Sequence, residues 1–164
     1  MKGYLFKLFI SFSLLAIAGC GFHLRGAANI PPSLQTIYVQ GVNMQQGLGL
    51  ELKRGLTRNN VNVVDNYQEG SAVLTVLENK VERRVLSVGS DAKVSEYELF
   101  GTAKFTIVDS QGKSLAEQQE VHAVRDLQFD QDQVLGKVEE AQVLRYQINQ
   151  QMVQSIMTRL SVLK

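Results

Sequence analysis

The pattern of apolar and polar positions changes its period several times along the chain. A largely apolar run occupies residues 8–18, and short apolar runs flank a segment of four-residue spacing between residues 34 and 64. From residue 72 to about residue 129 apolar and polar residues alternate, and residues 134–160 return to helical spacing. Because alternation is typical of strands and a spacing of three to four residues is typical of helices, these changes predict the order of the elements.

The part of the chain before residue 65 predicts a strand, a helix and a second strand. The strands are expected at residues 34–40 and 61–64, and the helix at residues 47–59. The apolar positions of this helix recur every four residues: Leu48, Leu52 and Leu56. Asn59 and Asn60 are suited to end the helix, since asparagine tolerates left-handed backbone angles. A strand, a helix and a strand in this spacing predict a parallel crossover.

The alternating region predicts three long strands joined by two turns. The turns are expected at residues 89–92 and 109–112, and the third strand runs from residue 114 to about residue 129. On the first strand, one face is expected to carry the apolar residues Val73, Leu77, Val81 and Val85. The opposite face is expected to carry the charged residues Glu78, Lys80, Glu82 and Arg84. We therefore expect an antiparallel meander with one solvent-exposed face.

A long helix is predicted at the C-terminal end of the chain. Either Asp130 or Asp132 can cap its start, and it extends to about Leu160. Its apolar stripe consists of Val134, Val138, Ala141, Leu144, Ile148, Met152, Ile156 and Leu160. Two helices and one mixed, largely antiparallel sheet predict an α/β fold, a two-layer sandwich with both helices packed on one face of the sheet.

The N-terminal apolar run has the features of an export signal. Lys2 and Lys7 form a basic start, and the 11-residue apolar core LFISFSLLAIA follows. As a helix this core would be ~16 Å long, about half the thickness of a bilayer's hydrocarbon core. It therefore predicts a signal peptide over residues 1–19 and not a membrane span.

The end of this signal resembles the bacterial lipobox, in which an aliphatic residue and two small residues precede a lipidated cysteine. Here the sequence is Ile-Ala-Gly followed by Cys20. The alternative is a buried free cysteine after an ordinary signal. Gly21 is not the aspartate associated with inner-membrane retention, so we expect an outer-membrane anchor. Residues 20–33 are then a lipidated tether, and residues 34–164 are a single domain.

Composition and motifs give no support for an enzyme, a metal site or nucleic-acid binding. The 17 Lys and Arg residues balance 16 Asp and Glu residues, which excludes a strongly basic surface. The single cysteine excludes a disulfide scaffold, and His23 and His122 do not form a metal-ligand motif. No G-x-S-x-G elbow is present, and the acidic pair Glu139 and Glu140 is more typical of a helix start. We expect no catalytic residue and no cofactor.

Binding therefore remains, and basic residues near two chain tips are the candidates. They lie at one hairpin and at the entry to the last helix: Arg83, Arg84, Lys93 and Lys137. Lysine and arginine in such positions suit phosphate groups. The alternative is ordinary solvated charges paired with Glu82, Glu96 or Glu139. Arg125 falls in phase with apolar neighbours, and is either a buried structural arginine or the mark of a bulge.

Four stretches of the sequence resemble a known family, the LPS-assembly lipoproteins called LptE. They are Cys20–Gly26, Val61–Asp65, Arg84–Val88 leading to Glu96 and Tyr97, and Asp130–Lys137. The resemblance implies a non-enzymatic outer-membrane lipoprotein that plugs the β-barrel LptD and assists lipopolysaccharide transport and assembly, with a similar sandwich fold. Lys137 matches a basic family position, whereas the neutral Ser90, with Lys93 three residues on, stands at the hairpin tip where the family is expected to carry arginine.

The implied partners are LptD, in a one-to-one complex, and lipopolysaccharide, and the implied location is the periplasmic side of the outer membrane within the barrel lumen. A free-standing lipid or protein carrier anchored in the outer membrane is the alternative, and an enzyme acting on cell wall comes third. A carrier requires an apolar pocket of several hundred Å³. A plug requires a filled core and a broad polar surface.

Overall fold

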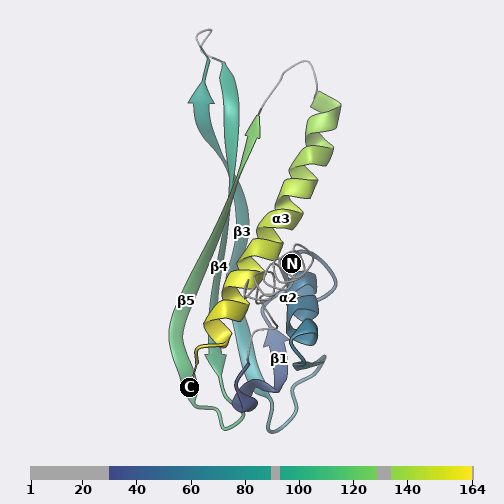
Figure 1. Cartoon of the computed structure of the whole chain (residues 1–164), viewed down its shortest axis with the longest axis vertical. Helices are drawn as coiled ribbons and strands as arrows, with labels where there is room; N and C mark the ends of the chain where they lie inside the picture. Colours follow the sequence, from purple (N-terminus) through teal and green to yellow (C-terminus); the bar gives the residue numbers. More distant parts are fainter. Residues whose placement is uncertain (1–29, 90–92, 129–133, 164) are drawn as a thin grey trace, which may run out of the picture.

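A five-stranded mixed sheet and two helices make up the fold in the computed structural model, which describes residues 30–89, 93–128 and 134–163 (Figure 1). The elements are a 3-10 turn η1 (Pro32–Leu34), β1 (Thr36–Gln40), α2 (Gly47–Arg58), β2 (Asn62–Val64), β3 (Ala72–Val88), β4 (Val94–Val108), β5 (Ser114–Gln128) and α3 (Val134–Leu160). The expected signal peptide, Cys20, most of the tether, Ser90, Asp130 and Asp132 lie outside the described residues.

The strand order in the sheet is β2-β1-β3-β4-β5. β1 is parallel to both of its neighbours, β2 and β3, while β3, β4 and β5 form an antiparallel meander. Both helices lie on the same side of this sheet (Figure 1). The predicted α/β sandwich, parallel crossover and meander are confirmed. The sheet is more evenly mixed than expected, because two of its four strand pairs are parallel.

The boundaries of the first elements follow from their local chemistry. Leu34 belongs to the 3-10 turn and not to the strand, because the backbone N–H of Leu34 donates to the carbonyl of Pro31 at 2.9 Å. α2 ends at Arg58, and Asn60 has a φ of 60°, as expected for an asparagine after a helix. The predicted four-residue stripe is confirmed, since its leucines are buried: Leu48, Leu52 and Leu56.

One hydrophobic core lies between the helices and the lower part of the sheet. On the sheet, Leu74, Phe105 and Ile107 are fully buried. On α3, the fully buried residues are Ile148, Met152, Ile156 and Leu160. The helix approaches the sheet closely at Gly101, where a Cβ atom would overlap Cγ2 of Ile148. Each large apolar side chain buried in this way contributes ~1.5–3 kcal/mol to stability.

The expected apolar face of β3 is wrong at its beginning. The buried residues there are Ala72, Leu74 and Val76, so Val73 lies on the opposite face. An irregularity in the β3–β4 pairing between Val76 and Glu78 places Leu77 outside the regular register, where it is 52% exposed. An extra residue in one strand reverses the alternation that follows. The expected charged face beyond the irregularity is confirmed.

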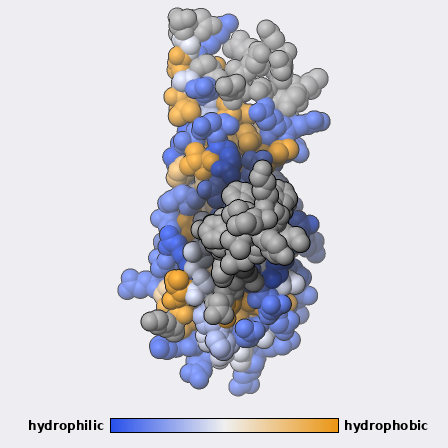
Figure 2. Space-filling view, in the orientation of Figure 1, coloured by the Kyte–Doolittle hydropathy of each residue, from blue (hydrophilic) through white to orange (hydrophobic). Residues whose placement is uncertain are grey.

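The upper part of the sheet differs from the lower part. We call residues 77–88 of β3, 94–102 of β4 and 122–128 of β5 the arm. β1 pairs with β3 only along Ala72–Thr75, so the arm is a three-stranded ribbon among the described residues. The N-terminal half of α3 rises beside it (Figure 1). Apolar side chains are exposed between the charged ones in this upper part (Figure 2).

Candidate functional site: the polar face of the arm

The candidate basic residues are distributed over different surfaces. Arg83 and Arg84 are neighbours on β3, and neighbouring residues of a strand point to opposite faces. Lys93 precedes β4 at the hairpin end, where the N–H of Gly89 donates to the Lys93 carbonyl at 2.7 Å. Lys137 belongs to the first turns of α3, and its side chain lies outside the described part. Arg83 and Arg84 therefore do not belong to one cluster.

Arg84 lies on the face of the arm directed away from the helices. Its guanidinium carbon is 3.8 Å from the centre of the Phe100 ring. Its Nη2 atom is also 3.4 Å from Oε2 of Glu82. The pairing with Glu82 that was considered as an alternative is thus present, and stacking on an aromatic face adds to it.

Arg83 lies on the opposite, helix-facing side. Its guanidinium carbon is 4.4 Å from the centre of the Tyr97 ring. Leu99, which pairs with Arg83 across the ladder, is buried. The two neighbouring arginines therefore stack on two different aromatic rings, one on each face of the arm.

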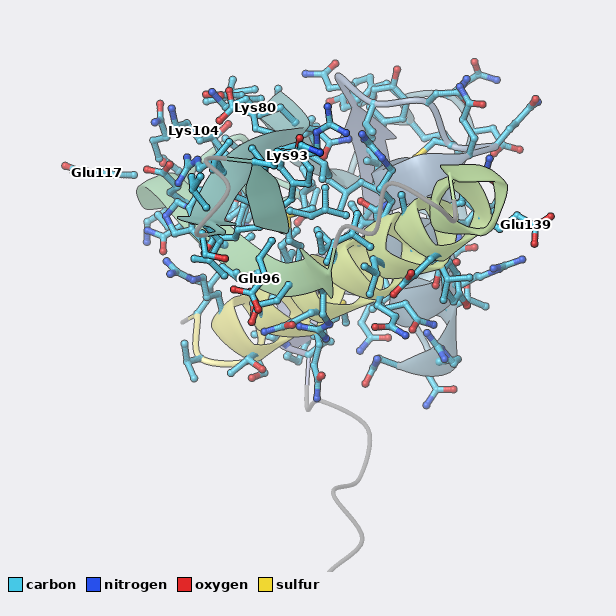
Figure 3. All side chains as sticks on the ribbon, turned by 90° about the horizontal axis from the view of Figure 1, so that it is seen from above. Lys80, Lys93, Glu96, Lys104, Glu117 and Glu139 are labelled. Atoms are coloured by element: carbon cyan, nitrogen blue, oxygen red, sulfur yellow. The ribbon has the colours of Figure 1, made fainter. Side chains whose placement is uncertain are left out.

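An alternating row of charges covers the outer face of β3 and continues onto β4. We call Glu78, Lys80, Glu82, Arg84 and Lys104 the charged ladder. Lys80 Nζ is 3.3 Å from Glu78 and 3.2 Å from Glu82, and Lys104 Nζ donates to Glu78 at 2.6 Å. Lys80 and Lys104 lie on the same side of the sheet, far from Glu139 on α3 (Figure 3). Every member of the ladder has a partner of opposite charge.

These ion pairs shift the pKa values of the ladder. The pKa of Glu78 is lowered mainly by its hydrogen bond from Lys104, and the pKa of Glu82 mainly by its hydrogen bond from Lys80. The pKa of Lys80 is raised mainly by its bond to Glu82, and the pKa of Lys104 mainly by its bond to Glu78. All four groups are partly exposed to solvent, so the ladder is a polar surface of two acidic and three basic side chains, each paired with a side chain of opposite charge.

The polar face continues onto β5 through His122. The imidazole Nδ1 is 3.3 Å from the Thr102 hydroxyl oxygen, and Nε2 is 3.8 Å from Glu120. The ring also packs against Phe100, with ring centres 5.2 Å apart. Phe100 thus lies between Arg84 and His122 on an otherwise polar surface, and sequence reasoning missed it. Phe100 could have been found from the sequence, because it is an aromatic residue at one of the polar positions of the alternating pattern.

Arg125 connects the arm to α3. Its Nε donates to Gln147 at 3.3 Å and its Nη1 donates to Gln151 at 2.5 Å. The pairing of β4 with β5 is regular at this position, with Arg125 opposite Leu99. Of the two alternatives for Arg125, the bulge is wrong, and the buried structural arginine is correct only in part, because Arg125 bonds to α3 but is half-buried.

Other kinds of site are not formed by the described residues. Within residues 30–89, 93–128 and 134–163, His, Cys, Asp and Glu do not gather in groups of three that could hold a metal ion. The helices of the same ranges are too short or too polar to span a bilayer. What the geometry offers is a binding surface.

Comparison with known proteins gives this surface a family context. A family model described as "LptE: Lipopolysaccharide-assembly" matches residues 34–160. An LPS-assembly lipoprotein LptE from Pectobacterium atrosepticum is 30% identical over 109 residues, which cover 66% of this chain and 59% of that protein. Another from Yersinia enterocolitica is 25% identical, covering 99% of this chain and 78% of the relative.

The fold is also found in solved structures. The solution structure of a lipoprotein B from Nitrosomonas europaea superposes with a TM-score of 0.69 at 26% identity, covering 86% of this chain and 90% of that one. The family model extends from the last residue of η1 to the end of α3, so it includes all five strands and both helices. The chain therefore belongs to the LptE family.

Proposed function

We propose that this protein is a non-enzymatic outer-membrane lipoprotein that plugs the LptD β-barrel one-to-one and assists lipopolysaccharide transport and assembly. Residues 1–19 are its signal peptide, residues 20–33 its tether with acylated Cys20, and residues 34–164 its single domain. The observation that carries the proposal is the family match over residues 34–160, together with relatives named LPS-assembly lipoproteins. It requires no cofactor.

The packing between α3 and the sheet supports a plug over a lipid carrier. A carrier needs an apolar cavity, and drug-sized ligands already occupy ~300–1,000 Å³. At Gly101, a Cβ atom would overlap Ile148 and would lie 3.2 Å from the sulfur of Met152. Where one methyl group does not fit, an acyl chain cannot pass between helix and sheet.

The charged ladder supports a polar environment such as the lumen of a large barrel. The interiors of outer-membrane barrels are polar, and their walls carry charges of both signs. Since the two acidic side chains of the ladder, Glu78 and Glu82, each pair with two of its basic side chains, the outer face can approach such a wall with these charges already paired. The face is broad because it extends over β3, β4 and β5.

For lipopolysaccharide phosphates we propose Lys137 and Lys93 as the main contacts, with Arg83 and Arg84 as weaker ones. Stacking on Tyr97 and Phe100 uses the flat faces of the two guanidinium groups. The N–H donors of a guanidinium lie in its plane, so stacking is compatible with a phosphate at the edge. Each charge-assisted contact is worth ~1.5–3 kcal/mol.

The lipid contacts are tested by charge reversal at the upper end of the molecule. Lys137→Asp/Lys93→Asp should bind purified lipopolysaccharide at least tenfold more weakly than the wild type, with an unchanged circular dichroism spectrum. The matched control, Arg58→Asp/Lys113→Asp, reverses two exposed basic residues outside the arm and should bind as the wild type does. Equal binding by all three proteins contradicts the assignment.

Placement in a barrel is tested by protease protection in native outer membranes. Exposed trypsin sites at Arg84 in the arm and at Lys93 next to it should be cleaved slowly in membranes and rapidly in the isolated mature protein. Rapid cleavage in both preparations would favour the carrier alternative.

A further inference from the structure

The arm has an open strand edge on the side opposite β5. β1 covers β3 only as far as Thr75, and beyond that point β3 pairs with β4 alone among the described residues. An open edge presents unpaired N–H and C=O groups, and natural proteins usually protect it with charges, proline or bulges. This edge is long, and its pairing with β4 is regular from Glu78 to Val85, roughly 27 Å at ~3.4 Å per residue.

Apolar side chains are concentrated on this strand. Leu77, Val85, Leu86 and Val88 are each about half exposed or more, at 52%, 56%, 49% and 56%. On the other edge strand, β5, the one large apolar residue with comparable exposure within its described positions is Val124, at 37%. A strand edge that is open and also apolar at both ends is suited to pair with another strand.

The charge pattern between these ends is complementary to itself. When two copies of β3 pair antiparallel about a twofold axis at Val81, Glu78 lies opposite Arg84 of the partner copy, and Lys80 lies opposite Glu82. All four charged positions on the outer face of the regular stretch meet an opposite charge in this register. On the other face, Val81 meets its own copy and Arg83 meets the neutral Asn79. Opposite charges directly across a strand pair are favourable, and like charges are unfavourable.

The neighbouring registers do not share this property. With the axis at Lys80, Glu78 lies opposite Glu82 and Lys80 lies opposite itself. With the axis at Glu82, Lys80 lies opposite Arg84 and Glu82 lies opposite itself. Because a register must keep the charged residues on one face, these are the nearest alternatives, and both place like charges together. The sequence ENKVERRV of residues 78–85 thus specifies one register.

We propose that the open edge of β3 pairs with the same edge of a second copy of this chain, antiparallel and centred on Val81. The contact is isologous, with each copy offering the same surface. Eight paired residues form a small interface, so the dimer is weak and reversible and covers the edge while the protein is outside a larger complex. The inference goes beyond the proposed function and does not depend on it.

The first test is the oligomeric state of the mature lipoprotein and two charge variants, measured by sedimentation equilibrium in detergent. The wild type should form dimers as its concentration rises. Lys80→Glu places glutamates opposite each other, and Glu82→Lys does the same with lysines, so each variant alone should shift the dissociation constant tenfold or more towards monomer. An equimolar mixture of the two variants should dimerise like the wild type, because every pair between unlike copies is again of opposite charge.

This mixture separates the proposal from nonspecific association. Association through the lipid anchors in one micelle would not depend on the charge pattern, so all the proteins would dimerise alike. If the variants dimerised weakly only because ion pairs within each strand were lost, they would dimerise just as weakly in the mixture as alone. Rescue by mixing therefore requires the proposed register. A wild type that remains monomeric, or a mixture that remains monomeric, overturns the proposal.

The second test is a disulfide across the twofold axis. Residues opposite each other in an antiparallel pair have Cα atoms ~4.5–5.5 Å apart, which is within the range of a disulfide. Under mild oxidation, Val81→Cys should give a covalent dimer, while Val124→Cys on β5 should not. The wild type, whose single cysteine is Cys20, is the control for covalent dimers formed through Cys20. Crosslinking of Val124→Cys in place of Val81→Cys would assign the contact to the other edge and contradict the proposal.

Discussion

The two ends of the same three strands behave differently. At the lower end, Leu74, Phe105 and Ile107 are almost completely inaccessible, because α2, α3 and β1 cover them. In the arm, Val85 and Leu86 on β3 are about half exposed although they have the same β-branched or aliphatic character. The difference shows that burial is decided by the helices and strands that cover a position. The residue type alone does not decide it.

This contrast separates two roles. The lower end contains the buried apolar area that stabilises the domain, whereas the arm carries the charged ladder and the two stacked arginines. Substitutions at the two ends should therefore change different observables. Those in the core should change the free energy of unfolding, and those at the exposed positions of the arm away from α3 should change binding at nearly constant stability.

The largest expected effect is loss of stability in the core. Phe105→Ala removes a fully buried ring and should lower the free energy of unfolding by ~3–5 kcal/mol. Val85→Ala, on the exposed part of β3, should change it by less than ~0.5 kcal/mol. Urea denaturation monitored by circular dichroism measures both. Similar values for the two variants would remove the distinction between core and arm.

A smaller effect is expected where the arm is attached to α3. Arg125→Met removes the hydrogen bonds to Gln147 and Gln151 and should cost ~1–2 kcal/mol. Amide hydrogen exchange should become faster in the N-terminal half of α3. In the control Arg159→Met, which loses a bond to Gln119, the helix end is still held by the buried Leu160, so exchange should change little. Faster exchange at both ends alike would contradict a specific attachment.

The charged ladder should make a modest, pH-dependent contribution. The lowered pKa values of Glu78 and Glu82 mean that their contribution is present above pH 4.5 and is lost as the pH falls through the folded-state pKa values. The raised pKa values of Lys80 and Lys104 mean that their contribution is present below pH 10.5 and is lost as the pH rises through the folded-state values.

Melting temperatures of the wild type and Lys104→Met, recorded as a function of pH, test this account. The difference between the two proteins should persist at neutral pH and shrink below pH 4.5, because protonation removes the negative charge of Glu78 and with it the ion pair to Lys104. Lys113→Met, which removes an exposed charge at the β4–β5 turn, is the matched control. A difference that does not depend on pH in the acidic range would exclude the Glu78–Lys104 pair as its cause.

The smallest effect is expected at the stacked arginine of the polar face. Phe100→Leu keeps an apolar side chain but removes the ring beneath Arg84, which should cost ~0.5–1 kcal/mol. In the Arg84→Met background the same substitution should cost less, and the double-mutant cycle gives the coupling energy. A coupling of zero would show that the stacking does not contribute to stability.

The sequence predicted the elements whose signals are local. The stripe of Leu48, Leu52 and Leu56 identified α2, and the alternation from residue 72 to about residue 129 identified the three strands of the meander. The charges of the ladder were also placed on the correct face. In each case the periodicity of the side chains matches the geometry of one element, and no distant contact is required.

Features that depend on several elements were not predictable. The irregularity at Leu77 is defined only by the pairing of β3 with β4, and it displaced the expected apolar face of β3. By contrast, the separation of Arg83 from Arg84 follows from strand geometry alone and could have been predicted, because neighbouring residues of a strand point to opposite faces. The partners of Arg125 lie more than twenty positions along the chain, on α3.

The most direct test of the central claim is native mass spectrometry of the complex extracted from outer membranes in mild detergent. We expect one copy of this chain, lacking residues 1–19 and carrying acyl mass on Cys20, bound to one copy of LptD. Detection of this protein alone, or with an unmodified Cys20, under conditions that keep other membrane complexes intact would contradict its role as a lipid-anchored plug.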